Sequence, residues 1–298
     1  MINIVCTSKP GDGLLCYSYE HCCYLNSIGI EAQLVIITHY NFSKKHYIDA
    51  ITEKYKTCTN IIFDFYTPET NDITFILGRS MLTLLWKSRD EYSTDQLMTG
   101  HLLFNNKLIS VYSENHVKEY PIALEYFKPK EVYDLCDYDV YPNGVGTQYE
   151  KMINFEEYKP VKNDVQFEYL FLGTNDVYYK EVDRWIKECP RCFTSHGILT
   201  YDEDYTIIDY NNIIAPVHNL LGLFNTYVYT KNYYDPAPRL IQECKWLGKN
   251  IEYLRDKNIK DGGPVYMKRP VPTKKMYSDN AKILVKLIET INEKNIIS

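Results

Sequence analysis

Short apolar runs alternate along the first half of the chain with longer segments in which apolar residues recur at helical spacing. Buried strands are predicted at residues 2–6, 32–37, 60–65, 73–77, 107–112 and 131–136. Helices are predicted between the earlier strands, at residues 14–27, 43–56 and 80–87. Strands that alternate with helices form βαβ units, so the pattern predicts an α/β fold built on a parallel sheet.

The alternation starts again after a turn-rich stretch, residues 141–146, and a weakly periodic polar segment that continues to residue 164. Strands are then predicted at 166–172 and 206–210, and helices at 177–189, at 212–223 and, capped by Ser278, at the C-terminal end. A chain of 298 residues is long enough for two domains. We expect a domain at 1–145, a linker at 146–165, a second domain at 166–275 and a terminal helix at 276–298.

The most informative local pattern occupies residues 226–254. An apolar, β-branched run at 226–230 predicts a short buried strand, and a second strand is predicted at 251–254. Between them Asp235 is a natural N-cap, Pro236 suits a first helical turn, and Gly248 is placed to end the helix. A βαβ unit of this kind places the helix N-terminus at the carboxyl edge of a parallel sheet, where nucleotide phosphates are usually held.

Two charged residues near the start of this helix suggest a binding role. Arg239 and Glu243 are four positions apart and therefore share one face of the helix. An Arg beside a helix N-terminus can neutralise a diphosphate, and a Glu one turn later can accept the hydroxyl groups of a ribose. The alternative is that Asp235 only caps the helix and that Arg239 and Glu243 form a surface ion pair of little consequence.

Asp235 and Glu243 together read D-x7-E, and residues 243–249 read Glu-Cys-Lys-Trp-Leu-Gly-Lys. This resembles the E-x7-E signature, ending in E-A-x-x-x-G-K, of nucleotide-sugar glycosyltransferases that have the two-Rossmann-domain (GT-B) architecture. In this chain the first acid is Asp, and it lies beside two prolines rather than in a glycine-rich loop. The resemblance implies that Asp235 contacts the donor sugar, that Glu243 binds the ribose, and that two Rossmann-like domains face each other across a cleft.

The resemblance also implies a reaction and a co-substrate. We expect transfer of a hexose, glucose in the first instance, from a nucleotide-diphosphate sugar, in the first instance a UDP-sugar, held by the C-terminal half. The helix dipole and Arg239 would stabilise the leaving diphosphate, so no metal and no other cofactor is expected. Family members have a terminal helix that packs back across the first domain, and the segment 276–298 is expected to do the same.

Further site candidates lie in loops that follow predicted strands. Gly173 and Thr174 follow the first strand of the second half, where a glycine loop faces the donor diphosphate in the family. In the first half, Asp12 lies in a Gly-x-Gly loop, and Glu114 and His116 follow the strand at 107–112. These three residues are candidates for catalysis on the acceptor side. The alternatives are a turn-forming Asp12 and an ordinary polar loop around Glu114 and His116.

The composition of the chain disfavours several classes of partner and site but identifies no catalytic residue. The formal charge of −6 gives no general affinity for nucleic acid. Nine Cys without a disulfide-like spacing, and a strand directly after Met1, favour reduced thiols in a cytoplasmic protein. No apolar run is long enough to insert into a membrane. Cys189 and Cys192 form a CxxC without a second ligand pair, which disfavours zinc.

The acceptor and the oligomeric state are left open by the sequence. The 29 Tyr and the abundant Asn, Lys and Ile are typical of an A/T-rich genome, and viral (phage) glucosyltransferases that modify hydroxymethylated DNA bases share the GT-B architecture. The basic residues Lys268, Arg269, Lys274 and Lys275 form either a groove for DNA or a solvated face. A saccharide acceptor, a non-catalytic nucleotide-sugar-binding protein and an epimerase of the same two-domain plan are the alternatives.

Overall fold

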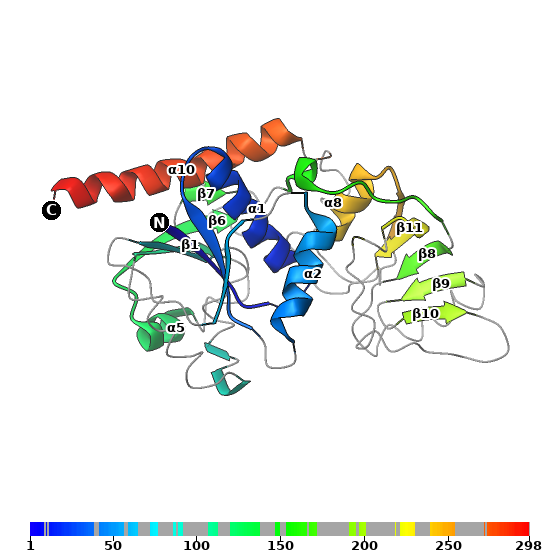
Figure 1. The fold of residues 1–298 in the computed structure, drawn as a ribbon, viewed down its shortest axis with the longest axis horizontal. Helices are drawn as coiled ribbons and strands as arrows, with labels where there is room; N and C mark the ends of the chain where they lie inside the picture. The colour runs from blue at the N-terminus through cyan, green and yellow to red at the C-terminus, as the bar shows by residue number, and fades with distance from the viewer. Residues whose placement is uncertain are drawn as a thin grey trace. The chain divides into compact units, whose positions relative to one another are not determined.

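The fold is that of a computed structural model of the 298-residue chain (Figure 1). It describes residues 1–8, 10, 12–38, 42–56, 59–64, 72–76, 86–87, 89–91, 107–112, 120–137, 147–149, 153–165, 167–171, 191–194, 197–200, 218, 221–229, 239–253, 271 and 273–297. The chain forms two compact units, Met1–Tyr158 together with Thr273–Ser298, and Lys159–Pro272. The first part of the first unit therefore ends at Tyr158, and the second unit begins at Lys159.

The first unit contains a seven-stranded sheet with the order β3-β2-β1-β4-β5-β6-β7, in which all neighbouring strands are parallel. The strands are β1 Ile2–Cys6, β2 Ala32–Ile36, β3 Ile61–Phe63, β4 Ile73–Ile76, β5 Lys107–Tyr112, β6 Glu131–Asp137 and β7 Thr147–Tyr149. The prediction of an α/β protein with a parallel, Rossmann-like sheet is confirmed. The sequence did not predict β7, because Thr-Gln-Tyr contains no apolar run; pairing with β6 defines this strand.

The central strands of this sheet are buried along their whole length. Every residue of β1, β2 and β4 is buried, and most of these residues are Ile, Val, Leu or Phe. A strand covered on both faces is expected to be apolar throughout rather than alternating, which explains why the sequence shows runs and not a two-residue period. Helix α1, Gly13–Ser27, packs against β1 and β2.

A chain of side-chain hydrogen bonds crosses the amino ends of the four strands β3, β2, β1 and β4. Asn60 Nδ2 donates to Gln33 Oε1 at 3.0 Å, and Gln33 Nε2 donates to Asn3 Oδ1 at 2.7 Å. Asn3 Nδ2 donates in turn to Asp72 Oδ2 at 3.1 Å. The four residues follow the spatial order of the strands, so a slip of one residue in any strand would break the chain. This amide ladder therefore specifies the register of the sheet.

The remaining described helices of the first unit are α2 Lys44–Lys54, α5 Tyr120–Phe127 and α10 Lys274–Ile297, with short 3-10 segments at Arg89–Glu91 and Phe155–Glu157. The sequence placed the start of the last helix at Ser278, and this is wrong. Thr273 caps the helix instead, because its Oγ1 accepts a hydrogen bond from the backbone N–H of Met276 at 3.3 Å. Ser278 lies inside the helix.

Helix α10 belongs to the first unit. The ring of Tyr277 packs edge-to-face against Tyr24 and His21 of α1, with centroid distances of 5.5 Å and 5.7 Å. Near the other end of the helix, Lys294 Nζ lies 5.5 Å from the ring centroid of Tyr133 on β6. His21 is itself a core residue, since its Nδ1 is 2.9 Å from the carbonyl oxygen of Tyr17 and its Nε2 is hydrogen-bonded to the hydroxyl of Tyr149.

The second unit contains a five-stranded sheet with the order β10-β9-β8-β11-β12. Its elements are β8 Phe167–Phe171, β9 Arg191–Thr194, β10 Gly197–Thr200, β11 Phe224–Tyr229, α8 Arg239–Trp246 and β12 Asn250–Tyr253. Strands β9, β8, β11 and β12 are parallel, and β10 pairs antiparallel with β9. The sequence predicted β8, β11, α8 and β12. It missed β9 and β10, which are four-residue strands without a clear apolar alternation.

The predicted helix at 177–189, the predicted strand at 206–210, and most of the predicted helices at 80–87 and 212–223 lie outside the described residues. The predicted cleft between the two units stays a prediction. Among the helices that the structure describes, none combines the length and the apolar character needed to cross a bilayer.

Candidate functional site

Helix α8 connects two parallel, neighbouring strands. β11 and β12 are paired in parallel with Thr226 opposite Asn250 and Tyr229 opposite Tyr253. A crossover between parallel neighbours must return the chain from the carboxyl edge of the sheet to its amino edge, so the start of α8 lies on the side of the carboxyl edge. The βαβ unit predicted from residues 226–254 is therefore present, and Arg239 is the first helical residue among those that the structure describes.

Arg239 and Glu243 form an ion pair in which Glu243 is buried and Arg239 is partly buried. The Nε of Arg239 donates to Oε1 of Glu243 at 2.9 Å, and the two side chains are 13% and 2% exposed. Glu243 therefore does not form part of a surface ion pair, whereas the predicted binding role of the pair stays a prediction. A buried carboxylate is tolerated only when it is paired, and removing its partner typically costs about 3–5 kcal/mol. The chain thus holds a guanidinium in place at the first turn of α8.

The apolar face of α8 explains why this pair is buried. Ile241 and Cys244 are completely buried against the unit's interior, and Glu243 lies between them in sequence. Burial raises the pKa of the Cys244 thiol far above its ordinary value, so this thiol stays protonated and packs as a small apolar group. Gly248 ends the helix with a φ of +68°, as the sequence predicted, and Lys249 N donates to the carbonyl oxygen of Cys244 at 2.9 Å.

Asp12, the predicted residue of the first unit that the structure describes, acts as a helix cap. It follows β1 and precedes α1, and its Oδ1 accepts a hydrogen bond from the backbone N–H of Leu14 at 3.1 Å. The side chain is exposed at the carboxyl edge of the sheet. Neighbouring β1 and β4 meet at the point where the strand order reverses, which is where open α/β sheets bind ligands.

The other predicted site residues lie outside the described residues: Glu114, His116, Gly173, Thr174 and Asp235. Of the three that are described, Arg239 and Glu243 contact each other, whereas Asp12 belongs to the other unit.

The sequence did not predict a polar pair at the carboxyl edge of the first sheet. Asp64 follows β3 and Thr38 lies two residues after the end of β2, and both are buried. Asp64 Oδ1 accepts hydrogen bonds from the backbone N–H of Thr38 at 2.8 Å and from its hydroxyl at 2.9 Å. Asp64 has a φ of 59°, a left-handed conformation that Asp tolerates better than most residues. An acid directly after the apolar run 61–63 was the available signal.

Metal chemistry finds no support in the described part of the chain. There, no group of three or more His, Cys, Asp or Glu side chains is arranged to hold a metal ion. Cys192 of the CxxC lies on β9, and Cys189 lies outside the described residues.

Comparison with known proteins adds no relative: no protein-family model matches the chain, and neither a curated protein nor a solved structure matches it. Function is therefore inferred from the residues and the geometry of this chain.

Proposed function

We propose that the protein is a glycosyltransferase that moves a hexose, glucose in the first instance, from a nucleotide-diphosphate sugar to a hydroxyl acceptor. The observation that carries this proposal is the buried Arg239–Glu243 pair at the start of α8, in a βαβ unit of parallel strands. An apolar residue at either position would pack more cheaply, because burying two charges costs solvation free energy. A charged pair kept at a helix start beside a carboxyl sheet edge suits an anionic ligand.

In this proposal the start of α8 holds the diphosphate. Arg239 lies in the first turn, where the helix macrodipole already favours negative charge. Its Nε–H binds Glu243, and this contact fixes the orientation of the guanidinium plane, whose terminal nitrogens are suited to grip phosphate oxygens in pairs. The same interactions would strengthen as charge develops on the leaving diphosphate, which is how a transferase of this kind works without a metal.

Glu243 would act on the ribose of the donor, and uridine is the nucleotide that we propose. A carboxylate has several acceptor positions, so one oxygen can hold Arg239 while the other accepts hydroxyl protons of the sugar. Asp235, Gly173 and Thr174 are proposed to complete the donor site on the loops at the same edge of the sheet. Two observations support the proposal that α8 binds the nucleotide: the D-x7-E spacing of Asp235 and Glu243, and the burial of Glu243.

The acceptor side is proposed to lie on the first unit. Asp12, exposed at the carboxyl edge beside the reversal point between β1 and β4, is one candidate base, and Glu114 and His116 are the others. The acceptor is proposed to be a hydroxymethylated DNA base, with a saccharide as the alternative. Because DNA binding releases counterions, activity on duplex DNA would fall steeply with salt, whereas activity on a neutral saccharide would not.

One incubation separates transfer from binding alone and from isomerisation. The protein is mixed with UDP-glucose carrying a labelled sugar and with either hydroxymethylated DNA or a panel of oligosaccharides. Labelled acceptor together with free UDP supports the proposal. Retained donor without turnover identifies a nucleotide-sugar-binding protein, and a changed sugar configuration identifies an epimerase; either result contradicts the transferase proposal.

A further inference from the structure

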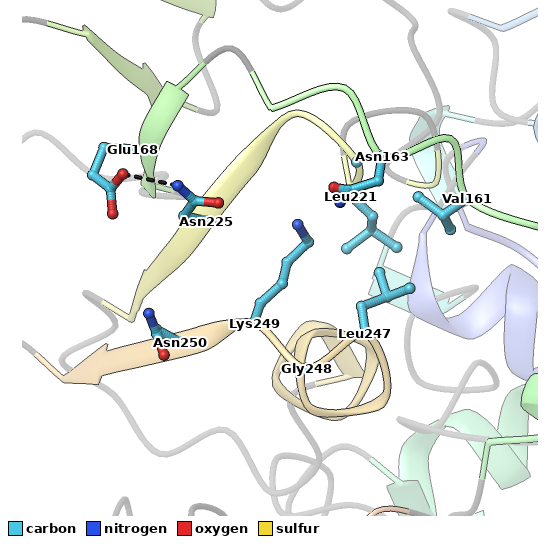
Figure 2. A pocket seen from close by; sticks show the side chains of 10 residues that line it. Val161, Asn163, Glu168, Leu221, Asn225, Leu247, Gly248, Lys249 and Asn250 are labelled. Atoms are coloured by element: carbon cyan, nitrogen blue, oxygen red, sulfur yellow. Dashed lines mark hydrogen bonds between the residues drawn. The ribbon is translucent and has the colours of Figure 1, made fainter.

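A pocket of about 370 Å³ lies at the amino edge of the second sheet, where no site residue was predicted (Figure 2). Three of its lining residues mark this edge: Glu168 near the start of β8, Asn225 near the start of β11, and Asn250 at the start of β12. The turn that follows α8 closes another side through Leu247, Gly248 and Lys249. The volume is within the range of small-molecule sites.

Lys249 supplies a positive charge to this pocket. Figure 2 shows its amine extending into the space between Asn225 and Leu221. The Nζ donates to the backbone carbonyl of Phe224 and lies 4.6 Å from the centroid of the Phe224 ring. Burial lowers the pKa of Lys249. An ammonium has three N–H groups, and among the described residues Phe224 takes one of them, so two are left for water or a ligand.

Glu168, the acidic residue of the pocket lining, points away from the amine of Lys249. Glu168 Oε2 accepts a hydrogen bond from Asn225 Nδ2 at 2.9 Å, and Figure 2 shows Glu168 beyond Asn225 on the side opposite Lys249. Within the described part of the chain, Lys249 forms no ion pair with a carboxylate. The centre of the pocket is therefore positive, and the amides of Asn163, Asn225 and Asn250 around it can form further hydrogen bonds.

We propose that this pocket binds a small molecule through a phosphate group, which Lys249 contacts and which the carboxamides orient. A Lys is a compact point charge and is a common phosphate ligand. Leu221 and Leu247 form an apolar wall beside the amine, which excludes water from one side and strengthens the contact. The site is separate from the proposed donor site, because Arg239 and Lys249 flank opposite ends of α8, whose eight residues span about 12 Å.

Acylation of Lys249 by acetic anhydride tests the proposal, with inorganic phosphate as the probe. Only the free amine reacts, so a bound phosphate that raises the pKa of Lys249 by about one unit slows acylation at fixed pH about tenfold. Rates at Lys249 and Lys245 are measured by mass spectrometry in phosphate and in chloride of equal ionic strength. Lys245 is a matched control, because burial also lowers its pKa but it does not line the pocket. Selective slowing at Lys249 supports the proposal; equal rates in the two salts overturn it.

Two substitutions at one exposed position provide a second test that does not alter Lys249. Asn163 lines the pocket and is exposed, so Asn163→Asp and Asn163→Lys leave the fold intact. The added carboxylate is expected to weaken phosphate binding about three- to tenfold in calorimetry, and the added amine to strengthen it by a similar factor. If the two variants bind phosphate equally, or if phosphate does not bind the wild-type protein at millimolar concentration, the proposal is wrong.

Discussion

The amide ladder at the amino ends of β3, β2, β1 and β4 gives the sharpest stability prediction. Asn3 is its central member: it is completely buried, accepts from Gln33 and donates to Asp72. Replacement by Leu keeps the approximate volume but removes both hydrogen bonds. Gln33 and Asp72 are themselves buried, so water cannot easily replace the hydrogen bonds that they lose with Asn3.

The expected cost follows from these two groups. A buried polar group that loses a hydrogen bond costs about 1–3 kcal/mol, and the value for Asp72 is at the lower end because its Oδ1 keeps an ion pair with the Met1 ammonium at 3.2 Å. Asn3→Leu is therefore expected to lower the free energy of unfolding by about 2–4 kcal/mol. Asn60→Ala is the matched control, because Asn60 is the exposed end of the same ladder and water can replace its single contact. Its expected cost is about 0.5–1.5 kcal/mol.

Urea unfolding followed by circular dichroism measures both variants, and hydrogen exchange of the β1 and β2 amides assigns the loss to the first unit. A double-mutant cycle of Asn3→Leu with Gln33→Leu is expected to give a coupling energy of about 1–2 kcal/mol. If Asn3→Leu costs no more than Asn60→Ala, or if the two substitutions of the cycle are additive, the ladder does not hold the strands in register.

Two further predictions concern the backbone and the thiols. Gly248→Ala is expected to cost about 1 kcal/mol in thermal unfolding, because φ is +68° and an added Cβ meets nothing within 4 Å, so backbone strain is the whole effect; an unchanged midpoint would contradict it. Burial raises the pKa of Cys6 from its ordinary value of 9.0 to about 12. The unfolded chain therefore loses this proton first as pH rises above about 9, and stability is expected to fall by about 1.4 kcal/mol per pH unit from there toward the folded-state pKa. Cys22, Cys23 and Cys244, whose pKa values burial also raises, contribute slopes of the same sign, so Cys6→Ala is expected to reduce the slope in urea titrations between about pH 7 and pH 11 by the share of one thiol. A slope that persists unchanged would refute the assignment.

The sequence predicted the parts of the fold that depend on local patterns. The strand and glycine signals around α8 correctly predicted a parallel βαβ unit, because each of them acts within a few residues. Strands β7, β9 and β10 were missed because Thr-Gln-Tyr, Arg-Cys-Phe-Thr and Gly-Ile-Leu-Thr contain at most two consecutive apolar residues, so their pairing partners decide their conformation. The choice of Ser278 as a cap failed because Thr273 offers the same chemistry five residues earlier.

The candidate site was predictable only in part. The spacing of Arg239 and Glu243 indicated that they share a face of α8, but their burial depends on how the helix packs, which no local pattern encodes. The same holds for Asp64, which joins Thr38 across 26 positions of sequence. Asp12 had two interpretations, a catalytic residue on the acceptor side and a turn-forming residue. The structure shows that its side chain accepts a hydrogen bond from the backbone N–H of Leu14.

Calorimetric titration of UDP-glucose into the wild-type protein and two variants tests the central claim, that Glu243 and Arg239 at the start of α8 hold the donor nucleotide. Glu243→Gln removes the buried carboxylate, and Glu252→Gln removes the same charge from an exposed position of β12 in the same unit. Circular dichroism confirms that each variant is folded before titration. The account predicts that Glu243→Gln weakens binding by about 1–3 kcal/mol while Glu252→Gln has no effect. Equal affinity in all three proteins, or no binding to the wild type, would contradict it.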